Sequence, residues 1–183
     1  VSGLGYINWT YQNSWADVDL DGDLDLMTSG DLYINTTADI PGCCNHWLEV
    51  RLEGNGITAN RDAVGAQVRI ETSMGVLVRQ VEIGTGEGNV NDKVLHFGLG
   101  EDVGPFDLSI SWPDGQVQSE TEVDPNQLIY IEQCRDLDGD GYYNQTCGGD
   151  DCDDSDPDTS PTAIEYCDGI DNNCDTIVDN DAI

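Results

Sequence analysis

The chain carries far more carboxylates than basic side chains, and this excess limits what it can fold into. Its 183 residues include 37 Asp and Glu but only 6 Lys and Arg, for a formal net charge of −31. Such a charge attracts cations and repels phosphate backbones and anionic lipid, which argues against nucleic-acid partners and membrane insertion. Because the chain also keeps 4 Trp and 7 Tyr, we expect it to fold rather than stay disordered.

Carboxylates at alternate positions predict a first calcium loop at residues 17–25. Glycine stands at the sixth position, Gly22, where a loop wrapped around an ion must bend. We assign as ligands the side chains of Asp17, Asp19, Asp21 and Asp25 and the backbone carbonyl of Asp23. Calcium prefers six to eight oxygen ligands, which this spacing can supply.

Residues 134–183 hold 15 acidic residues and the single base Arg135, with little that could form an apolar core. Only disulfides and metals could keep such a segment ordered. A second calcium site is predicted from Asp136, Asp138, Asp140, the Tyr142 carbonyl, Asp151 and Asp153. A third is predicted from Asp171, Asn173, Asp175 and Asp179. The expected cofactor is therefore Ca²⁺.

Seven cysteines in a short chain indicate disulfides and an oxidising compartment. The candidates are Cys43, Cys44, Cys134, Cys147, Cys152, Cys167 and Cys174, a number that leaves one over. Cys43 or Cys44 could tie the ends of the central segment to Cys134. The last four cysteines could instead form a zinc site, but thiolates prefer soft metals and this neighbourhood is almost all carboxylate, which favours disulfides.

Short alternating apolar runs predict β-strands between residues 45 and 133. They are residues 47–52, 66–70, 76–83, 94–97, 106–112 and 128–131, and Pro113-Asp114-Gly115 is typical of a hairpin turn. No helical period competes with them. Regular short strands separated by glycine-rich turns favour an Ig-like β-sandwich.

Four motifs follow one another in this central segment: Asn45-His46-Trp47-Leu48, Asn60-Arg61-Asp62-Ala63-Val64-Gly65-Ala66, His96-Phe97-Gly98-Leu99-Gly100 and Trp112-Pro113-Asp114-Gly115. They resemble the successive motifs of the ASPIC/UnbV domain. The first calcium loop, followed by Leu32-Tyr33-Ile34-Asn35, is similar to one partial FG-GAP or VCBS repeat. A propeller needs several four-stranded blades, so this chain alone cannot build one.

The C-terminal segment combines D-x-D-G-D-G-Y, C-G-G-D-D-C-D-D and E-x-C-D-G-x-D-N-N-C-D. This combination resembles the Cys-rich, MopE-like metal-binding repeat of bacterial surface proteins and the calcium loops of thrombospondin-type proteins. Thr176 stands where that repeat usually has glycine. The resemblance implies a bacterial, extracellular protein.

The expected fold is all-β, with an Ig-like sandwich flanked by an N-terminal strand and calcium loop and by a loop-rich, disulfide- and calcium-stapled module. The expected domains are residues 1–42, 43–134 and 135–183. Candidate glycosylation sites are Asn8, Asn35, Asn144 and Thr176. No nucleophile motif or glycine-rich strand-to-helix turn accompanies the carboxylates, so we do not expect this protein to be an enzyme.

We therefore predict a secreted, calcium-binding structural protein that forms homo-oligomers or a head-to-tail fibre, or serves as a surface or adhesion subunit. The strand expected at residues 4–11 would need a sheet edge to pair with, and another copy could supply it. One alternative is a module that binds glycans or another surface through aromatics such as Trp9 and Trp15. Another is a processed fragment of a larger propeller-containing secreted protein, since the sequence starts at Val1.

Overall fold

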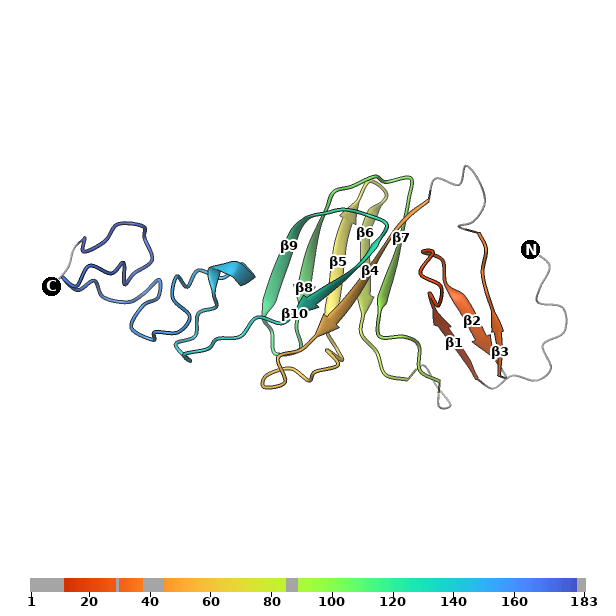
Figure 1. Cartoon of the computed structure of the whole chain (residues 1–183), viewed down its shortest axis with the longest axis horizontal. Helices are drawn as coiled ribbons and strands as arrows, with labels where there is room; N and C mark the ends of the chain where they lie inside the picture. Colours follow the sequence, from red (N-terminus) through yellow and green to blue (C-terminus); the bar gives the residue numbers. More distant parts are fainter. Residues whose placement is uncertain (1–11, 29, 38–44, 85–88, 181–183) are drawn as a thin grey trace. The chain divides into compact units, whose positions relative to one another are not determined.

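The fold is that of a computed structural model, in which residues 12–28, 30–37, 45–84 and 89–180 are described. The chain divides into two compact units, Val1–Glu132 and Gln133–Ile183, and Figure 1 shows their elements. This division falls two residues from the expected boundary at residue 134. The other expected boundary, at residue 42, lies outside the described residues and stays a prediction.

A small antiparallel sheet forms the N-terminal part of the first unit. Its strands are β1 (Asn13–Ala16), β2 (Asp25–Thr28) and β3 (Asp31–Tyr33), in the order β1-β2-β3. Trp15 pairs with Leu26, which in turn pairs with Tyr33, so three large side chains share one face. The loop that holds the first row of carboxylates joins β1 to β2, and the sheet fixes both of its ends.

Seven further strands make two sheets. They are β4 (His46–Glu53), β5 (Gln67–Thr72), β6 (Gly75–Gln80), β7 (Leu95–Gly100), β8 (Phe106–Ser111), β9 (Val117–Val123) and β10 (Gln127–Glu132). The sheets have the orders β10-β4-β7 and β6-β5-β8-β9. β10 runs parallel to β4, whereas the other pairs are antiparallel. The predicted Pro113-Asp114-Gly115 turn joins β8 to β9, and Gly115 has a φ of 96°.

Alternating side chains of both sheets meet in one apolar core. Fully buried members include Leu48 and Val50 of β4, Val68 and Ile70 of β5, Phe97 and Leu99 of β7, and Ile110 of β8. Each such side chain contributes about 1.5–3 kcal/mol on burial. The expectation of an all-β fold with a two-sheet sandwich is confirmed.

The Ig-like part of that expectation is not confirmed. In a constant-type immunoglobulin domain the first strand pairs with the second, which would give the orders β4-β5-β8-β7 and β6-β9-β10. Here β10 and β7 flank β4 instead, and of the strand pairs in those two orders only β5 with β8 is found. Period-2 alternation requires one buried face for each strand but does not choose its neighbours, so the sequence pattern fits both arrangements.

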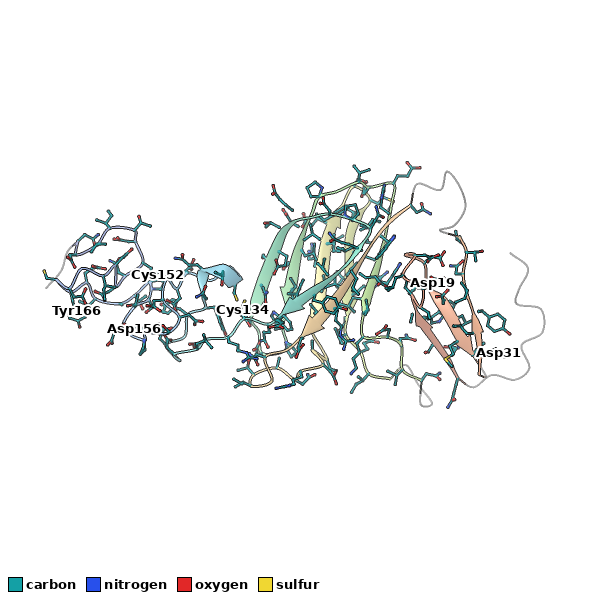
Figure 2. All side chains as sticks on the ribbon, viewed as in Figure 1. Asp19, Asp31, Cys134, Cys152, Asp156 and Tyr166 are labelled. Atoms are coloured by element: carbon teal, nitrogen blue, oxygen red, sulfur yellow. A yellow bond between two sulfur atoms is a disulfide. The ribbon has the colours of Figure 1, made fainter. Side chains whose placement is uncertain are left out.

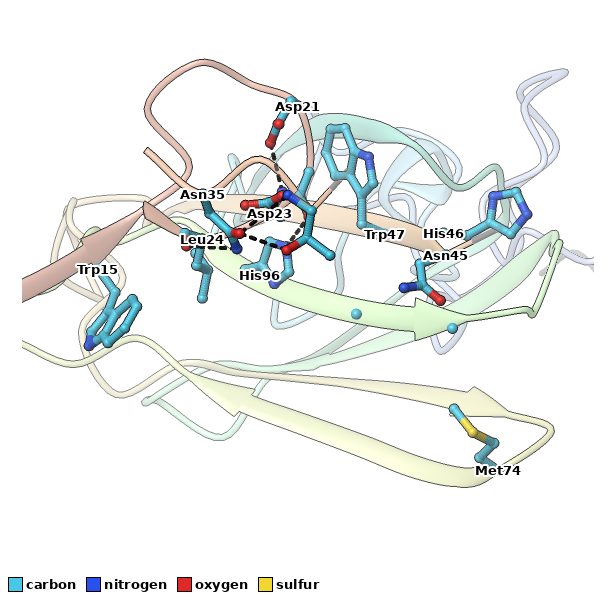
Figure 3. A pocket seen from close by; sticks show the side chains of 14 residues that line it. Trp15, Asp21, Asp23, Leu24, Asn35, Asn45, His46, Trp47, Met74 and His96 are labelled. Atoms are coloured by element: carbon cyan, nitrogen blue, oxygen red, sulfur yellow. Dashed lines mark hydrogen bonds between the residues drawn. The ribbon is translucent and has the colours of Figure 1, made fainter. Parts of the chain in front are cut away.

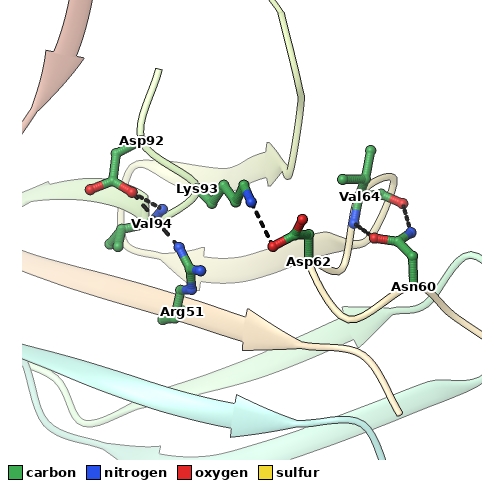
Figure 4. Close-up of polar contacts among 7 residues, drawn as sticks. All are labelled: Arg51, Asn60, Asp62, Val64, Asp92, Lys93 and Val94. Atoms are coloured by element: carbon green, nitrogen blue, oxygen red, sulfur yellow. Dashed lines mark hydrogen bonds and ion pairs between the residues drawn. The ribbon is translucent and has the colours of Figure 1, made fainter. Parts of the chain in front are cut away.

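Two ion pairs hold loops at one end of the sandwich (Figure 4). Lys93 Nζ lies 2.5 Å from an Asp62 carboxylate oxygen, and an Arg51 guanidinium nitrogen lies 3.8 Å from Asp92. The Lys93 ammonium lowers the pKa of Asp62 through a hydrogen bond and charge attraction. Two of the chain's six basic residues therefore tie the segment after β6 to β4 and to the loop that follows it.

The second unit is built mostly from turns. Its described part, residues 133–180, contains the short 3₁₀ helix η1 (Gln145–Cys147) and an isolated bridge between Asn144 and Asp151, and otherwise consists of loops and turns. Figure 2 labels Cys152, Asp156 and Tyr166 among them.

Across the described residues, the chain has no helix with the length and apolar character needed to cross a membrane.

Candidate metal centres

The first predicted loop folds around the carboxylate of its first residue. Asp17 Oδ1 accepts a hydrogen bond from the Asp21 N–H at 3.2 Å, and Asp17 Oδ2 accepts one from the Gly22 N–H at 2.8 Å. Gly22 has a φ of 94°, a conformation that glycine adopts without steric cost. The loop therefore turns back on itself and places its later carboxylates near the first.

Asp25, the last residue of this loop, is 1% exposed. Its two oxygens accept from Val18 N–H at 2.9 Å and from Asn35 N–H at 2.7 Å. One carboxylate oxygen from each of Asp17, Asp19 and Asp25 lies within 4.8 Å of the others. The structure thus brings three of the predicted ligands into one cluster.

The first cluster is electrostatically strained without a cation. Local desolvation raises the pKa of Asp19, which is otherwise exposed, and the carboxylates of Asp21, Asp25 and Asp17 raise it further. Asp21 Oδ2 is buried and has no hydrogen-bond partner among the described residues. Buried carboxylate oxygens without partners are costly, and a bound cation would satisfy them.

The first loop lies against the outer face of the sheet β10-β4-β7. His96 Nε2 of β7 lies 2.8 Å from the Gly22 carbonyl oxygen. A Cβ added to Gly22 would lie only 2.0 Å from the Trp47 indole, so glycine is also required for this close approach.

Beneath the loop, Glu49 is 3% exposed, and burial together with the Asp17 and Asp92 carboxylates raises its pKa to about 7. Glu49 is a further acidic group that the sequence pattern did not single out.

The second loop repeats the hydrogen bonding of the first. Asp136 Oδ1 accepts from Gly139 N–H at 2.6 Å, and Asp136 Oδ2 accepts from Gly141 N–H at 3.0 Å. Asp140 Oδ1 accepts from Tyr142 N–H at 2.8 Å. The predicted role of the Tyr142 carbonyl stays a prediction.

Two overlapping clusters of carboxylates form around the second loop and share Asp138. One consists of Asp136, Asp138 and Asp154, and the other of Asp138, Asp140 and Asp151. Asp151 is fully buried, and Oδ2 of Asp138, Asp140 and Asp151 each lacks a hydrogen-bond partner among the described residues. Desolvation raises the pKa of both Asp138 and Asp151, and nearby carboxylates add to the effect. Three unpartnered acceptors at one point fit a bound cation.

Asp154, rather than the predicted Asp153, joins this second site. Asp154 is 5% exposed, and its Oδ1 accepts a hydrogen bond from Leu137 N–H at 3.0 Å. Asp153 Oδ1 instead accepts from the N–H and hydroxyl of Ser155, at 3.3 and 2.6 Å. Both residues belong to an acidic run, so composition alone could not tell which one turns inward.

The third loop has the same backbone but a looser set of carboxylates. Asp171 accepts from the N–H groups of Asp175 and Thr176, at 3.1 and 2.8 Å. Asp175 N–H also lies 3.1 Å from Asn173 Oδ1, and Asn180 Nδ2 lies 2.6 Å from Asp175 Oδ2. The Asn180 amide lowers the pKa of Asp175. Among the described residues, no three acidic, His or Cys groups cluster at this loop.

Glu165 closes the third loop in a way that the sequence pattern did not indicate. It is 4% exposed, and its oxygens accept from Asn173 N–H at 2.8 Å and Asp179 N–H at 3.0 Å. The predicted ligand Asp179 instead accepts through Oδ1 from the Asp168 and Gly169 N–H groups, at 3.1 and 2.9 Å.

A common backbone pattern relates the three loops. In each, the first aspartate accepts from the N–H five residues later, and the fourth and sixth residues have positive φ. These φ values are 62° and 94° for Leu20 and Gly22, 86° and 96° for Gly139 and Gly141, and 59° and 75° for Cys174 and Thr176. The third loop thus holds a β-branched residue in a conformation that favours glycine.

One disulfide links the second and third loops. Cys152 and Cys174 are bonded, with an S–S distance of 2.05 Å, which rules out a zinc site that uses all four of the last cysteines as thiolates. Cys152 neighbours Asp151 of the second site, and Cys174 is the fourth residue of the third loop. Cys134 is buried with its Sγ 3.4 Å from the Cys147 carbonyl oxygen. Cys147 and Cys167 form no disulfide in the structure.

Cys43 and Cys44 lie outside the described residues, as does the candidate glycosylation site Asn8. Asn35 Oδ1 accepts from the Thr37 hydroxyl at 2.8 Å, and Asn144 caps η1 by accepting from Thr146 N–H at 2.8 Å. Both amides therefore have local structural roles.

Comparison with known families places two matches on this chain. Residues 56–136 match the family described as "ASPIC and UnbV", and residues 151–180 match the Cu-binding_MopE family, described as "Putative metal-binding motif". No curated protein matches the chain. The similarity of the N-terminal loop to FG-GAP or VCBS repeats stays a prediction. The chain therefore combines an ASPIC/UnbV domain with a C-terminal MopE-like metal-binding motif.

Proposed function

We propose that this chain is an extracellular, calcium-binding structural protein without catalytic activity. The observation that supports this most is a repeated one: the described residues contain three loops of the same backbone form. Two of these loops gather carboxylates into clusters and also contain buried aspartate oxygens that lack hydrogen-bond partners. Such loops gain stability when a cation binds and lose it when the cation leaves.

Calcium fits the donor atoms better than copper or zinc. The two acidic clusters consist entirely of aspartates, and hard oxygen ligands suit Ca²⁺, whereas copper and zinc favour nitrogen and sulfur. His46 and His96 are the only histidines of the chain, and both belong to the sandwich. The second site supplies five aspartates, and calcium accommodates so many carboxylates in flexible geometry.

An extracellular location agrees with the disulfide and with the metal-binding match. Disulfides such as Cys152–Cys174 persist in oxidising compartments. Calcium is abundant outside cells, where modules of low to moderate affinity stay loaded.

Head-to-tail assembly is the way in which such a protein would build a fibre or a surface layer. The sheet β1-β2-β3 has edge strands β1 and β3 among the described residues, and Met27 and Leu32, which pair across it, are 53% and 48% exposed. A small sheet with open edges and exposed apolar side chains is marginal alone and gains stability from a partner strand. The strand expected at residues 4–11 would supply that strand from a neighbouring copy.

The test joins metal binding to assembly in the full-length protein. Calcium titration by calorimetry should reveal saturable binding, with terbium luminescence as an independent readout. Light scattering and electron microscopy should show calcium-dependent polymers, and deletion of residues 1–12 should give monomers that still bind calcium. Absence of calcium binding would overturn the whole proposal, whereas a calcium-loaded monomer at high concentration would overturn the assembly alone.

A further inference from the structure

A large cavity lies between the first metal loop and the outer face of the sheet β10-β4-β7, within the first unit (Figure 3). Its volume is about 920 Å³, near the upper end of the 300–1,000 Å³ typical of small-molecule sites. The residues that give it chemical character are Trp15, Asn45, His46, Trp47, His96 and the loop carboxylate Asp21. None of the predicted metal sites uses the two indoles or the two imidazoles.

Glycine at position 98 keeps the floor of this cavity open. Gly98 lies inside β7 and faces away from the core, between the buried Phe97 and Leu99. A Cβ added there would meet no atom within 4 Å, and the backbone at Gly98 does not have the positive φ that would require glycine. Glycine inside a strand weakens it and often marks a place where a ligand approaches the backbone. Neither packing nor conformation accounts for this glycine, but an occupant of the cavity would.

The lining offers flat apolar surfaces together with both donors and acceptors. The Trp15 side chain is 44% exposed, and Figure 3 shows it on one side of His96 with Asn45 on the other. Asn126 Nδ2 lies 2.8 Å from His46 Nδ1, which leaves a proton on His46 Nε2 to donate. His96 Nε2 contacts the Gly22 carbonyl oxygen, which leaves Nδ1 as an acceptor.

A neutral carbohydrate suits this combination of groups. Sugar hydroxyls both donate and accept hydrogen bonds, and the C–H faces of the ring can stack on an indole. The net charge of −31 and the Asp21 carboxylate disfavour anionic ligands. The cavity volume of about 920 Å³ favours a chain of several sugar rings over a single one.

We propose that the cavity between the first metal loop and β7 is a binding site for a neutral oligosaccharide, with Trp15 and Trp47 as stacking surfaces and Gly98 as the open floor. Asp21, Gly22 and Asp23 form one wall, so an ordered metal loop shapes the site. Binding therefore strengthens when calcium is present.

The experiment uses the full-length protein on an array of neutral glucan, mannan and chitin oligosaccharides, followed by calorimetry with the best hexasaccharide. We expect saturable binding that weakens at least tenfold in Gly98→Leu, because the leucine side chain projects into the cavity from a position where its Cβ meets no atom within 4 Å. Ser111→Leu is the matched control, since it adds the same side chain to an exposed position on β8 and should bind as the native protein does. Should Gly98→Leu fail to fold, Trp15→Ala provides the second variant and is also expected to weaken binding tenfold.

Three results would overturn the proposal. The first is no saturable binding to any neutral glycan. The second is binding that Gly98→Leu and Trp15→Ala leave unchanged. The third is a preference for hexalysine or for sialylated and sulfated glycans that the two variants abolish, which would assign the cavity to a charged ligand instead.

Discussion

The two units of the chain stay ordered by opposite means. In the first unit, buried apolar side chains from two sheets form one continuous core. In the described part of the second unit, Cys134 is the only buried apolar residue, and the other buried side chains are polar: Gln133, Asp151, Asp154, Thr159, Ser160, Glu165 and Asn172. A core of apolar groups is stable by itself, whereas the buried carboxylates Asp151, Asp154 and Glu165 would gain stability from a bound cation. Metal removal should therefore act mainly on the second unit, and cavity-forming mutations mainly on the first.

Removing calcium should produce the largest difference between the two units. Each emptied loop leaves several carboxylates close together, and two unit charges about 4 Å apart repel by about 1 kcal/mol even in water. We expect excess chelator to abolish hydrogen-exchange protection over residues 133–180 and to loosen residues 17–25, while β4–β10 keep theirs. Equal protection with and without chelator would contradict the idea that cations hold the second unit together. Magnesium added in place of calcium serves as the control for ionic strength.

Phe97→Ala should destabilise the sandwich and leave the second unit unchanged, which is the reverse of the effect of calcium removal. Phe97 is fully buried at the centre of the sandwich, and truncation of a buried phenylalanine typically costs about 3–5 kcal/mol. The free energy of unfolding of the sandwich, followed by Trp fluorescence in denaturant, should fall by that amount, while calcium affinity of the second unit stays the same. Tyr130→Ala is the control, since Tyr130 is 75% exposed and its removal should cost below about 0.5 kcal/mol. A loss of calcium binding in Phe97→Ala would mean that the units are not independent.

The contrast between the units also explains what the sequence could predict. Alternation located six of the seven sandwich strands to within about three residues, because burial of one face sets a period of two whatever the topology. The polar, mostly exposed β9 was not among the predicted runs. The parallel pairing of β4 with β10 could not be predicted, because it joins segments some eighty residues apart. Loop backbones were predicted from Asp and Gly spacing, which is local chemistry. Glu49 was missed because it approaches its loop from a distant strand, β4. Asp154 was missed because an acidic run does not show which of its members turns inward, and Glu165 because it lies before the alternating set that begins at Asp171.

Loss of the disulfide should weaken the second unit less than loss of calcium does. Cys152 and Cys174 close a loop across a sequence separation of 22 residues, and a cross-link of this length contributes about 3 kcal/mol. Cys152→Ser should therefore increase hydrogen exchange in both the second and third loops and lower their calcium affinity together. Cys167→Ser, which removes an exposed thiol outside the disulfide, is the control and should change neither. An effect confined to one loop would show that the disulfide does not couple the two sites.

The smallest expected effect comes from exchanging the residue at the sixth position of two loops that share one backbone. Thr176 has a φ of 75°, and the equivalent Gly141 has a φ of 96°. A non-glycine residue in the left-handed region costs about 1–2 kcal/mol, so Thr176→Gly should relieve strain in the third loop. Glycine is more flexible than threonine in the unfolded chain, and this entropy difference offsets part of that gain. We expect a net stabilisation of about 0.5–1 kcal/mol and a several-fold rise in calcium affinity at this loop.

Gly141→Thr tests the same backbone in reverse: a Cβ at Gly141 meets no atom within 4 Å, so the cost arises from conformation alone. Calorimetric titration of both variants should show opposite shifts of similar size. Shifts of the same sign would mean that the two loops hold their ions differently despite their common backbone.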